Sequence, residues 1–455
     1  MSASPRRPAA LTLAAVPLGG AALAAAVPLV FLNVAWQPTF SVGAGGTSVQ
    51  VTLSDLAVLA VALVAFATGL RDGFAALAAP RAVWIASGVF LAWLFAASLY
   101  PRAWDPNYAT FTHLVTAAKF TEYALLAPAA VLLLRRRADL WWLLGAVVAW
   151  SVVCTGLGLA QYSGARILHA WPAGGRQPSL LGIHEFAAYS AATMALGLAA
   201  VAWRPPERAV RIGAAVATAS GIVGLVLSGA VAGGIGIGLA AVALAAVAWR
   251  RRTLTGRGFA VGAVALVLAA AGLLTMRSGD ITNFAHFAGV GTSSQSSGSR
   301  VQTYSQRTLM TYIGYRMWLG RPVLGIGWQA VREPQAYEPY LADAHRRFPD
   351  QPALAFPSRA HPWGIDDAYL QALAELGALG ALGFVAFLAT AVVHGAVVAL
   401  RARPEAALYG LLGLGWVLVA AGIWTGQGLV AGTPYDAVAW LGVGFVAAGA
   451  ARARA

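Results

Sequence analysis

The sequence predicts an all-α polytopic membrane protein with about twelve transmembrane helices and a large, partly helical outer loop between the ninth and tenth. Three observations predict this class. Of the 455 residues, 59% are hydrophobic, only 11% are charged, and the charged residues cluster between long apolar runs. A run of about 18 apolar residues is long enough to cross a bilayer. A soluble core of this size would need a more charged surface, so a water-soluble protein is excluded.

Apolar windows place the predicted spans in chain order. They lie near 9–34, 51–70, 83–100, 111–134, 139–160, 180–202, 209–228, 232–249, 258–276, 367–399, 406–425 and 430–450. The first follows a basic start and is too long for a cleaved signal peptide. The run at 367–399 is longer than a bilayer requires, so we expect it to begin outside the hydrocarbon.

The distribution of arginine predicts the orientation of these spans. With the N-terminus in the cytoplasm, the cytoplasmic segments hold 18 basic residues and the short outer loops hold three. The 18 are Arg6, Arg7, Arg71, Arg81, Arg135, Arg136, Arg137, Arg204, Arg208, Arg211, Arg250, Arg251, Arg252, Arg257, Arg401, Arg403, Arg452 and Arg454. The positive-inside rule then predicts that both termini are cytoplasmic. The net charge of +14 follows this topology and indicates no nucleic-acid partner.

Three regions follow from the span pattern: spans one to nine in residues 1–276, an outer loop in 277–365, and spans ten to twelve in 366–455. The loop is the one extramembrane region large enough to carry a site. Its stretch from 300 to 320 has helical periodicity, and Arg300 and Arg307 fall within about 20° of each other on one face. Leu309, Met310, Ile313 and Met317 share another side, which is apolar.

This outer surface is cationic and predicts an anionic ligand. Between residues 277 and 332 there are six arginines and one acid, Asp280. Guanidinium groups match phosphate oxygens, so Arg300 and Arg307 are candidate ligands of a membrane-embedded phosphate or diphosphate. For Arg316, Arg332, Arg346 and Arg347 we favour the simpler contact with lipid headgroups.

Several stretches resemble a known family. Arg307, "RPVLGIGWQAV" at 321–331 and "DDAYLQALAELGALG" at 366–380 resemble the signature region of the O-antigen ligase and polysaccharide polymerase superfamily. "TLSDLAVLAVAL" at 52–63 and "RQPSLLGIHEFAAYSAATMAL" at 176–196 resemble its second and sixth spans. The resemblance implies a multi-spanning glycosyltransferase of the C type, acting on the outer face of the bacterial cytoplasmic membrane. It would move a glycan from a polyprenyl diphosphate to an acceptor hydroxyl, with no metal or other cofactor.

The family resemblance makes residues near the start of the tenth span candidates for the catalytic base. Asp366 stands where polymerase-like members carry an aspartate, and it could also be no more than a helix N-cap. Asp367 is a cap neighbour or a group that orients the acceptor. His361 could be the base if the loop folds back. Glu375 lies about 180° from Asp366 around a helix, so we expect it to bond within the bundle.

The resemblance also proposes the diphosphate ligands, with one departure. Where the family often has Ser-Arg after the seventh span, this chain has Ser228 and Gly229. Arg176, Arg300 or Arg307 then covers the missing role, or the chain binds a different donor. Arg176 lies just outside the sixth span, with His184 and Glu185 about two turns further on.

Four other residues have a structural and a functional interpretation. Lys119 and Glu122 are three apart in the fourth span, so we expect a structural ion pair, with a substrate contact as the alternative. Trp328 and Trp363 suit an interfacial aromatic belt, or they could stack on a sugar ring.

A secondary transporter or flippase for a lipid-linked glycan is the competing function, because the chain has about twelve spans and intramembrane charges. The sequence shows no clear internal repeat, no GxxxxGK[ST] loop, no HExxH and one cysteine, Cys154. The resemblance implies as partners a polyprenyl-diphosphate-linked glycan and a glycan or lipid-linked acceptor, and the spans imply membrane lipids. The sequence leaves the choice between polymerase and ligase open.

Overall fold

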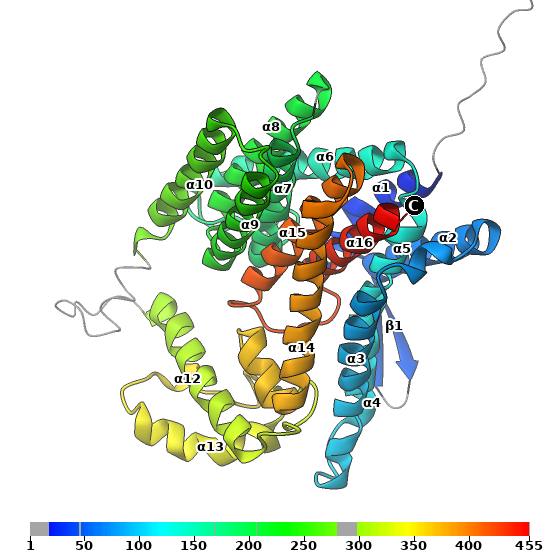
Figure 1. Ribbon diagram of the computed structural model, residues 1–455. Coiled ribbons are helices and arrows are strands. Elements are labelled where there is room, and N and C mark those ends of the chain that lie inside the picture. The colour runs from blue at the N-terminus through cyan, green and yellow to red at the C-terminus, as the bar shows by residue number, and fades with distance from the viewer. Residues whose placement is uncertain (1–17, 45–46, 169, 206, 280–297, 455) are drawn as a thin grey trace, which may run out of the picture.

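The computed structural model describes residues 18–44, 47–168, 170–205, 207–279 and 298–454. Among these residues, eleven helices are long and apolar enough to cross a membrane, which confirms the predicted all-α polytopic fold (Figure 1). They are α2 (Leu53–Asp72), α3 (Arg81–Ala97), α4 (Thr110–Ala124) with α5 (Leu126–Leu133), α6 (Arg137–Tyr162), α7 (Ile183–Trp203), α8 (Arg208–Ser228), α9 (Val231–Arg250), α10 (Gly256–Met276), α14 (Ala368–Arg401), α15 (Pro404–Ile423) and α16 (Pro434–Arg454).

A shorter apolar helix, α1 (Leu18–Val30), occupies the position of the first predicted span. Residues 1–17 lie outside the described residues, so the predicted start of that span at residue 9 is not described. Helices α7 and α15 form the centre of the bundle, because nearly all of their side chains are buried by neighbouring helices.

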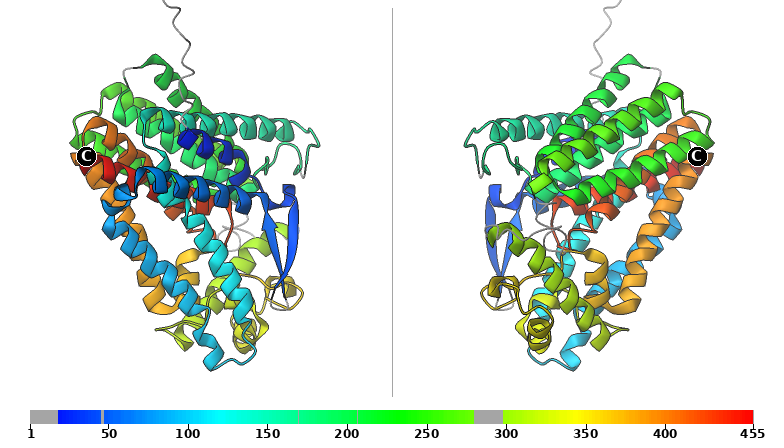
Figure 2. Two further views of the ribbon diagram at one scale, coloured as in Figure 1. Left: turned by 90° about the vertical axis from the view of Figure 1, so that its right-hand side faces the viewer. Right: turned by 90° about the vertical axis from the view of Figure 1, so that its left-hand side faces the viewer.

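One two-stranded sheet was not predicted. Strands β1 (Thr39–Ala44) and β2 (Thr47–Thr52) pair antiparallel between α1 and α2. Figure 2 shows this hairpin projecting from the edge of the bundle, while α3, α4 and α14 slant away from the other spans toward α12 and α13. The run "TFSV" and the run "TSVQVT" are rich in β-branched residues, which favours strands.

The outer region between α10 and α14 contains two helices, α12 (Gly298–Gly320) and α13 (Pro334–Arg347). The predicted apolar face of α12 is buried: Leu309, Met310, Ile313 and Met317 are each at most 1% exposed. Short 3-10 turns at Ala330–Arg332 and Ala353–Ala355 complete the region. Contact between α12 and α14 joins this region to the spans.

Helix α14 is broken near its start, which the sequence analysis did not predict. Gly377 has φ 67° and ψ −176°, which interrupts the helix, and the loop after α12 inserts at the break. The backbone N–H groups of Ile326 and Gly327 donate to the carbonyls of Ala374 and Glu375 at 3.0 and 2.9 Å. The N–H of Ala378 in turn donates to Pro322 at 2.8 Å. The inserted loop thus satisfies the backbone groups that the break leaves without helical partners.

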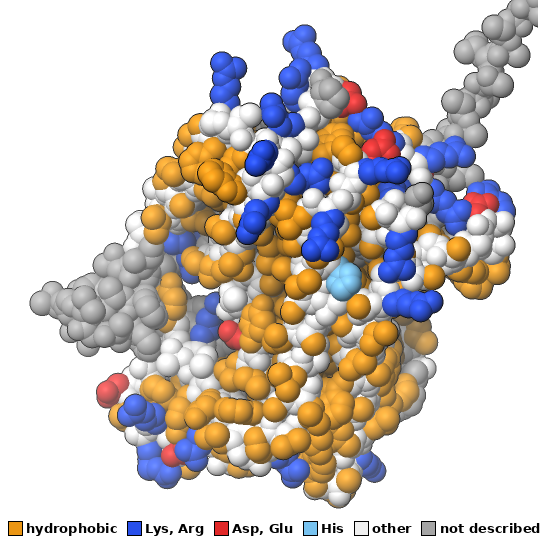
Figure 3. Space-filling model, in the orientation of Figure 1, with side chains coloured by type: hydrophobic (Ala, Val, Ile, Leu, Met, Phe, Trp, Pro, Cys, Tyr) orange, Lys and Arg blue, Asp and Glu red, His pale blue; other side chains and the backbone are white. Residues whose placement is uncertain are grey.

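The segments that carry the described arginines of the predicted cytoplasmic set meet at one end of the bundle. Side chains at these connections form ion pairs and hydrogen bonds with residues at neighbouring connections and helix ends. These contacts run between Arg135 and Asp72, Arg137 and Glu207, Arg251 and Ala399, and Trp203 and Pro404. In Figure 3, Lys and Arg side chains are spread over the upper half of the face, and the lower half is largely hydrophobic.

Candidate functional site

The structure brings Arg307 of α12 next to Asp366, which immediately precedes the N-cap of α14. Arg307 Nε lies 3.2 Å from Asp366 Oδ2, and both side chains are about one-third exposed. Although the charges are close, the Nε–H is not aimed in hydrogen-bond geometry at any acceptor among the described residues. A buried guanidinium donor of this kind favours an additional anionic ligand.

The two adjacent aspartates have different partners. Asp367 is the N-cap of α14, and its Oδ1 accepts a bond of 2.8 Å from the N–H of Leu370. The cap-only interpretation of Asp366 is therefore wrong: capping belongs to Asp367, because α14 begins at Ala368. Asp366 is left with its carboxylate beside Arg307.

Burial raises the pKa of the Asp366 carboxyl above its usual range, and the charges of Arg307 and Arg332 oppose that rise. Burial also raises the pKa of Asp367, opposed by backbone bonds from Leu370 and Tyr369. A carboxylate with a raised pKa is a stronger base than an exposed aspartate, so this environment suits Asp366 to proton abstraction.

Arg332 also belongs to the candidate site, although the sequence analysis favoured only a lipid-headgroup contact for it. Its guanidinium lies flat against Gly364, where an added Cβ would stand 2.8 Å from Nε. From there its charge acts on Asp366. Sequence patterns could not show this because the contact depends on how the loop before α14 folds. By contrast, Arg316 lies on another side of α12 and pairs with Asp343 at 3.1 Å.

His184 is under the electrostatic influence of three arginines. It lies in the first turn of α7, within electrostatic range of Arg307, Arg176 and Arg277. These arginines come from α12, from the loop before α7 and from the residue that ends α10. Arg277 was not a predicted site residue. Arg300 lies in the first turn of α12, but its side chain falls outside the described residues.

Arg176 is held on the C-terminal end of α8. Its Nε donates to the carbonyl of Ser228 at 2.8 Å, and its guanidinium carbon lies 5.6 Å from the centre of the Trp171 ring. Gly229 caps α8 in the left-handed region, at φ 60°, and faces the Arg176 side chain directly. The Arg176 side chain thus lies in the space next to residue 229, and whether it covers the role of the family's arginine stays a prediction.

Glu185 lies close to the same region from its position beside His184. Its carboxylate faces Gly182, where an added Cβ would stand 2.5 Å from Oε2. The fully buried Tyr435 is within electrostatic range of both Glu185 and Asp366. Because Glu185 lies in the first turn of α7, its charge suits the positive end of that helix.

Glu375 is separate from Asp366, as the helix geometry predicted. It is fully buried and accepts bonds from the backbone N–H groups of Gln329 at 3.0 Å and Val331 at 3.4 Å. Gln371 donates to it at 2.9 Å and also accepts from the N–H of Leu429 at 2.6 Å. Glu375 thus fixes the glycine-containing loop that follows α12 against α14.

The predicted ion pair between Lys119 and Glu122 is wrong. Lys119 Nζ instead lies 2.8 Å from Oδ2 of Asp55, at the start of α2. Asp55 also completes a capping box with Thr52. Glu122 is within electrostatic range of both charges, and its Oε1 is buried without a hydrogen-bond partner among the described residues. The true partner is far away in sequence, which is why local spacing misassigned it.

The two tryptophans have different environments. Trp328 is fully buried and donates its Nε1 to Thr116 at 2.9 Å, so sugar stacking on Trp328 is ruled out in this structure. Trp363 is half-buried, stacks on the exposed His361 ring at 5.6 Å between centroids, and donates to Leu354. The backbone N–H of His361 is bonded to the Ser358 hydroxyl at 3.1 Å, in a turn of the loop itself.

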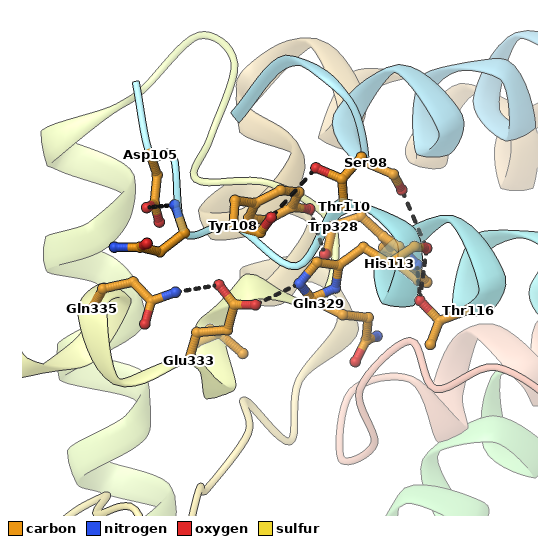
Figure 4. Close-up of polar contacts among 12 residues, drawn as sticks. Ser98, Asp105, Tyr108, Thr110, His113, Thr116, Trp328, Gln329, Glu333 and Gln335 are labelled. Carbon is orange, nitrogen blue, oxygen red and sulfur yellow. Dashed lines mark hydrogen bonds and ion pairs between the residues drawn. The ribbon is translucent and has the colours of Figure 1, made fainter. Parts of the chain in front are cut away.

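A second polar cluster connects residues 328–335, which precede and begin α13, to α4 and the loop before it (Figure 4). His113 Nε2 lies 2.7 Å from Glu333 Oε1, and Gln335 donates to the other oxygen of Glu333 at 2.8 Å. The Tyr108 ring stacks on His113, and its hydroxyl donates to the carbonyl of Trp328 at 3.0 Å. Because His113 is only 5% exposed, we interpret this cluster as a clamp that holds the start of α13 in place.

Comparison of the chain with protein-family models finds no match, and comparison with curated proteins finds none either. The chemistry of the site therefore rests on its own residues: the Asp366 carboxylate, whose pKa is raised by burial, lies next to Arg307 and within electrostatic range of Arg332.

Proposed function

We propose that this chain is a membrane glycosyltransferase that moves a glycan from a polyprenyl diphosphate to an acceptor hydroxyl. The observation that carries the proposal is the pairing of Arg307 with Asp366 at 3.2 Å, with Arg176 and Arg277 within electrostatic range of His184, as Arg307 is. Arg307 is thus both one of these arginines and the partner of Asp366, the candidate base. This fits the resemblance to O-antigen ligases and polysaccharide polymerases.

The chemistry requires two services from the protein. The anomeric carbon is joined to a diphosphate, which leaves with the electron pair of the broken carbon–oxygen bond. The arginines stabilise the charge that grows on that leaving group. Asp366 takes the proton of the acceptor hydroxyl as its oxygen bonds to the anomeric carbon, which inverts the configuration there.

The pairing of Arg307 with Asp366 supports an order of events. In the structure, the carboxylate of Asp366 has Arg307 as its ionic partner. A bound diphosphate competes for the same guanidinium, because phosphate oxygens match its fork of donors. The carboxylate is then released to accept a proton when the donor is in place.

The location follows from the charge pattern. The arginine-rich connections meet at one end of the bundle, and the positive-inside rule makes that end cytoplasmic. We propose a bacterial cytoplasmic membrane with the site on its outer face, where a lipid-linked glycan is used after it has been flipped outward.

Purified protein incubated with a labelled polyprenyl-diphosphate glycan tests the proposal. We expect transfer by the parent protein, and a loss of about 100-fold or more in Asp366→Ala and in Arg307→Ala. Arg346→Ala is the matched control, because Arg346 is an exposed arginine that pairs with Asp343 in the same outer region. Parental rates in both site variants would reject the proposal.

A lipid-linked-glycan transporter is the second candidate, favoured by the ion pair of Lys119 with Asp55 inside the spans. Proteoliposomes separate the two functions. Movement of the labelled glycan lipid across the bilayer, without any change in glycan length or attachment, would support transport. A change of attachment that is retained in Lys119→Gln would support transfer.

A further inference from the structure

The contact between Arg176 and Gly229 carries an inference that deepens the proposed function and rests on it. We propose that Gly229 is a positioning residue for the Arg176 guanidinium, and that positions 176 and 229 are alternative sources of one cationic group in the anion site.

The first step is steric. A Cβ at residue 229 would stand 2.8 Å from Cγ of Arg176, and 3.1 Å from both its Cδ and Nε. The side chain of Arg176 therefore passes through the space where any side chain of residue 229 would begin. Contacts under 3.0 Å between carbon atoms require one of the two groups to move.

The second step concerns the backbone of residue 229. Gly229 lies in the left-handed region, at φ 60° and ψ 19°, which disfavours most side chains. Yet the chain tolerates arginine in this conformation: Arg204 caps α7 at φ 61° and ψ 67°. Backbone conformation alone does not exclude an arginine at residue 229, whereas the Arg176 side chain does.

The third step is the anchoring of Arg176. Its Nε is bonded to the carbonyl of Ser228, and the N–H of the next residue, Gln177, donates to the carbonyl of Leu227 at 2.9 Å. The loop is thus fastened to the last turn of α8 at two neighbouring carbonyls. This fixes the Arg176 side chain at the C-terminal end of α8.

It follows that an arginine moved from 176 to 229 would start from the same place. With glycine at residue 176, the space now filled by Cγ and Cδ of Arg176 would be open to the new side chain. The end of α8 would then carry the guanidinium directly, and anion binding would be recovered without the original residue.

Four variants of the full-length protein in nanodiscs test this. We expect Arg176→Gly to weaken binding of inorganic pyrophosphate about tenfold or more, because charged hydrogen bonds are lost. The double variant Arg176→Gly with Gly229→Arg should recover most of that loss. Gly229→Ala should raise the KM for the lipid-linked donor with little change in kcat, because the added Cβ would displace the Arg176 side chain.

Gly432→Ala is the matched control. Gly432 also has a positive φ, 78°, but an added Cβ there meets nothing within 4 Å. It therefore carries the backbone cost of alanine without displacing an arginine. Pyrophosphate affinity should stay at the parental value in this variant, and thermal unfolding should show that each variant is folded.

Two results would overturn the inference. One is a folded double variant that binds pyrophosphate as weakly as Arg176→Gly. The other is a Gly229→Ala variant whose pyrophosphate affinity and donor KM equal those of the parent. Failure of the proposed function would look different, because the parent would then bind pyrophosphate but transfer no glycan from a polyprenyl diphosphate.

Discussion

At the scale of single residues, the two neighbouring aspartates at the start of α14 have different roles. Asp367 bonds to the helix that follows it, and Asp366 faces Arg307. Sequence reasoning identified both residues but could not assign the cap, because the first helical residue is uncertain by several positions. It also missed Arg332, which reaches the site only because Gly364 leaves room for its guanidinium.

Substitution by asparagine separates the two roles. Asn caps helices about as well as Asp, so Asp367→Asn should keep near-parental transfer and stability, while Asp367→Ala should lose roughly 0.5–2 kcal/mol of stability. Asp366→Asn should lose about 100-fold or more in transfer, since an amide cannot accept the proton. Transfer assays and thermal unfolding measure both, and equal losses in the two asparagine variants would contradict the assignment.

The pH dependence of transfer should report the charges around Asp366. Because the ionised carboxylate is the base, the rate should rise with pH through the pKa of Asp366, which burial raises. Arg332 opposes that rise, so Arg332→Gln should move the acid limb to higher pH. A pH–rate profile checks this against Arg346→Gln, and an acid limb that stays put or moves to lower pH would count against Asp366 as the base.

At the scale of elements, the break in α14 shapes the outer half of the molecule. The chain was expected to form one long helix from residue 367 to 399, and the apolar pattern does continue through Gly377. What periodicity could not show is that a second glycine-containing segment, residues 322–327, fills the break with backbone bonds. The Glu375 carboxylate of α14 then accepts hydrogen bonds from Gln329 and Val331, just after this segment, and so holds the segment against α14.

Alanine at residue 377 should therefore destabilise the protein. The conformation of Gly377 is almost restricted to glycine and costs other residues about 1–3 kcal/mol, and an added Cβ would stand 2.2 Å from the carbonyl oxygen of Val323. Gly383→Ala is the control in the same helix, because its Cβ would meet nothing closer than 4.0 Å. Thermal unfolding in detergent should show a lower midpoint for Gly377→Ala alone. Equal midpoints would mean that the break does not matter for stability.

At the scale of the whole molecule, apolar runs predicted most of the spans, and the orientation drawn from arginine counts stays a prediction. These signals are local, and they need only the length of each run and the charges at its ends. The β1–β2 hairpin and the pairing of Lys119 with Asp55 were not predicted. Both depend on which segments meet in three dimensions, and the two charged residues are separated by 64 positions.

Cysteine labelling tests the proposed orientation. Cys154 is buried, so a Cys154→Ala background allows single cysteines at the exposed Ala78 and Ala360. A membrane-impermeant maleimide should label Ala360→Cys in intact cells, because residue 360 lies in the outer region. It should label Ala78→Cys only after permeabilisation. The reverse pattern would place the site on the cytoplasmic face.

We propose that a polyprenyl diphosphate binds among Arg176, Arg277 and Arg307 with its sugar next to Asp366. A cryo-electron microscopy structure of the protein with a bound polyprenyl-diphosphate glycan tests it most directly. We predict phosphate oxygens within hydrogen-bond distance of Arg176 and Arg307, and the Asp366 carboxylate facing the anomeric carbon. A diphosphate bound elsewhere, with Arg307 still paired to Asp366, would contradict the claim.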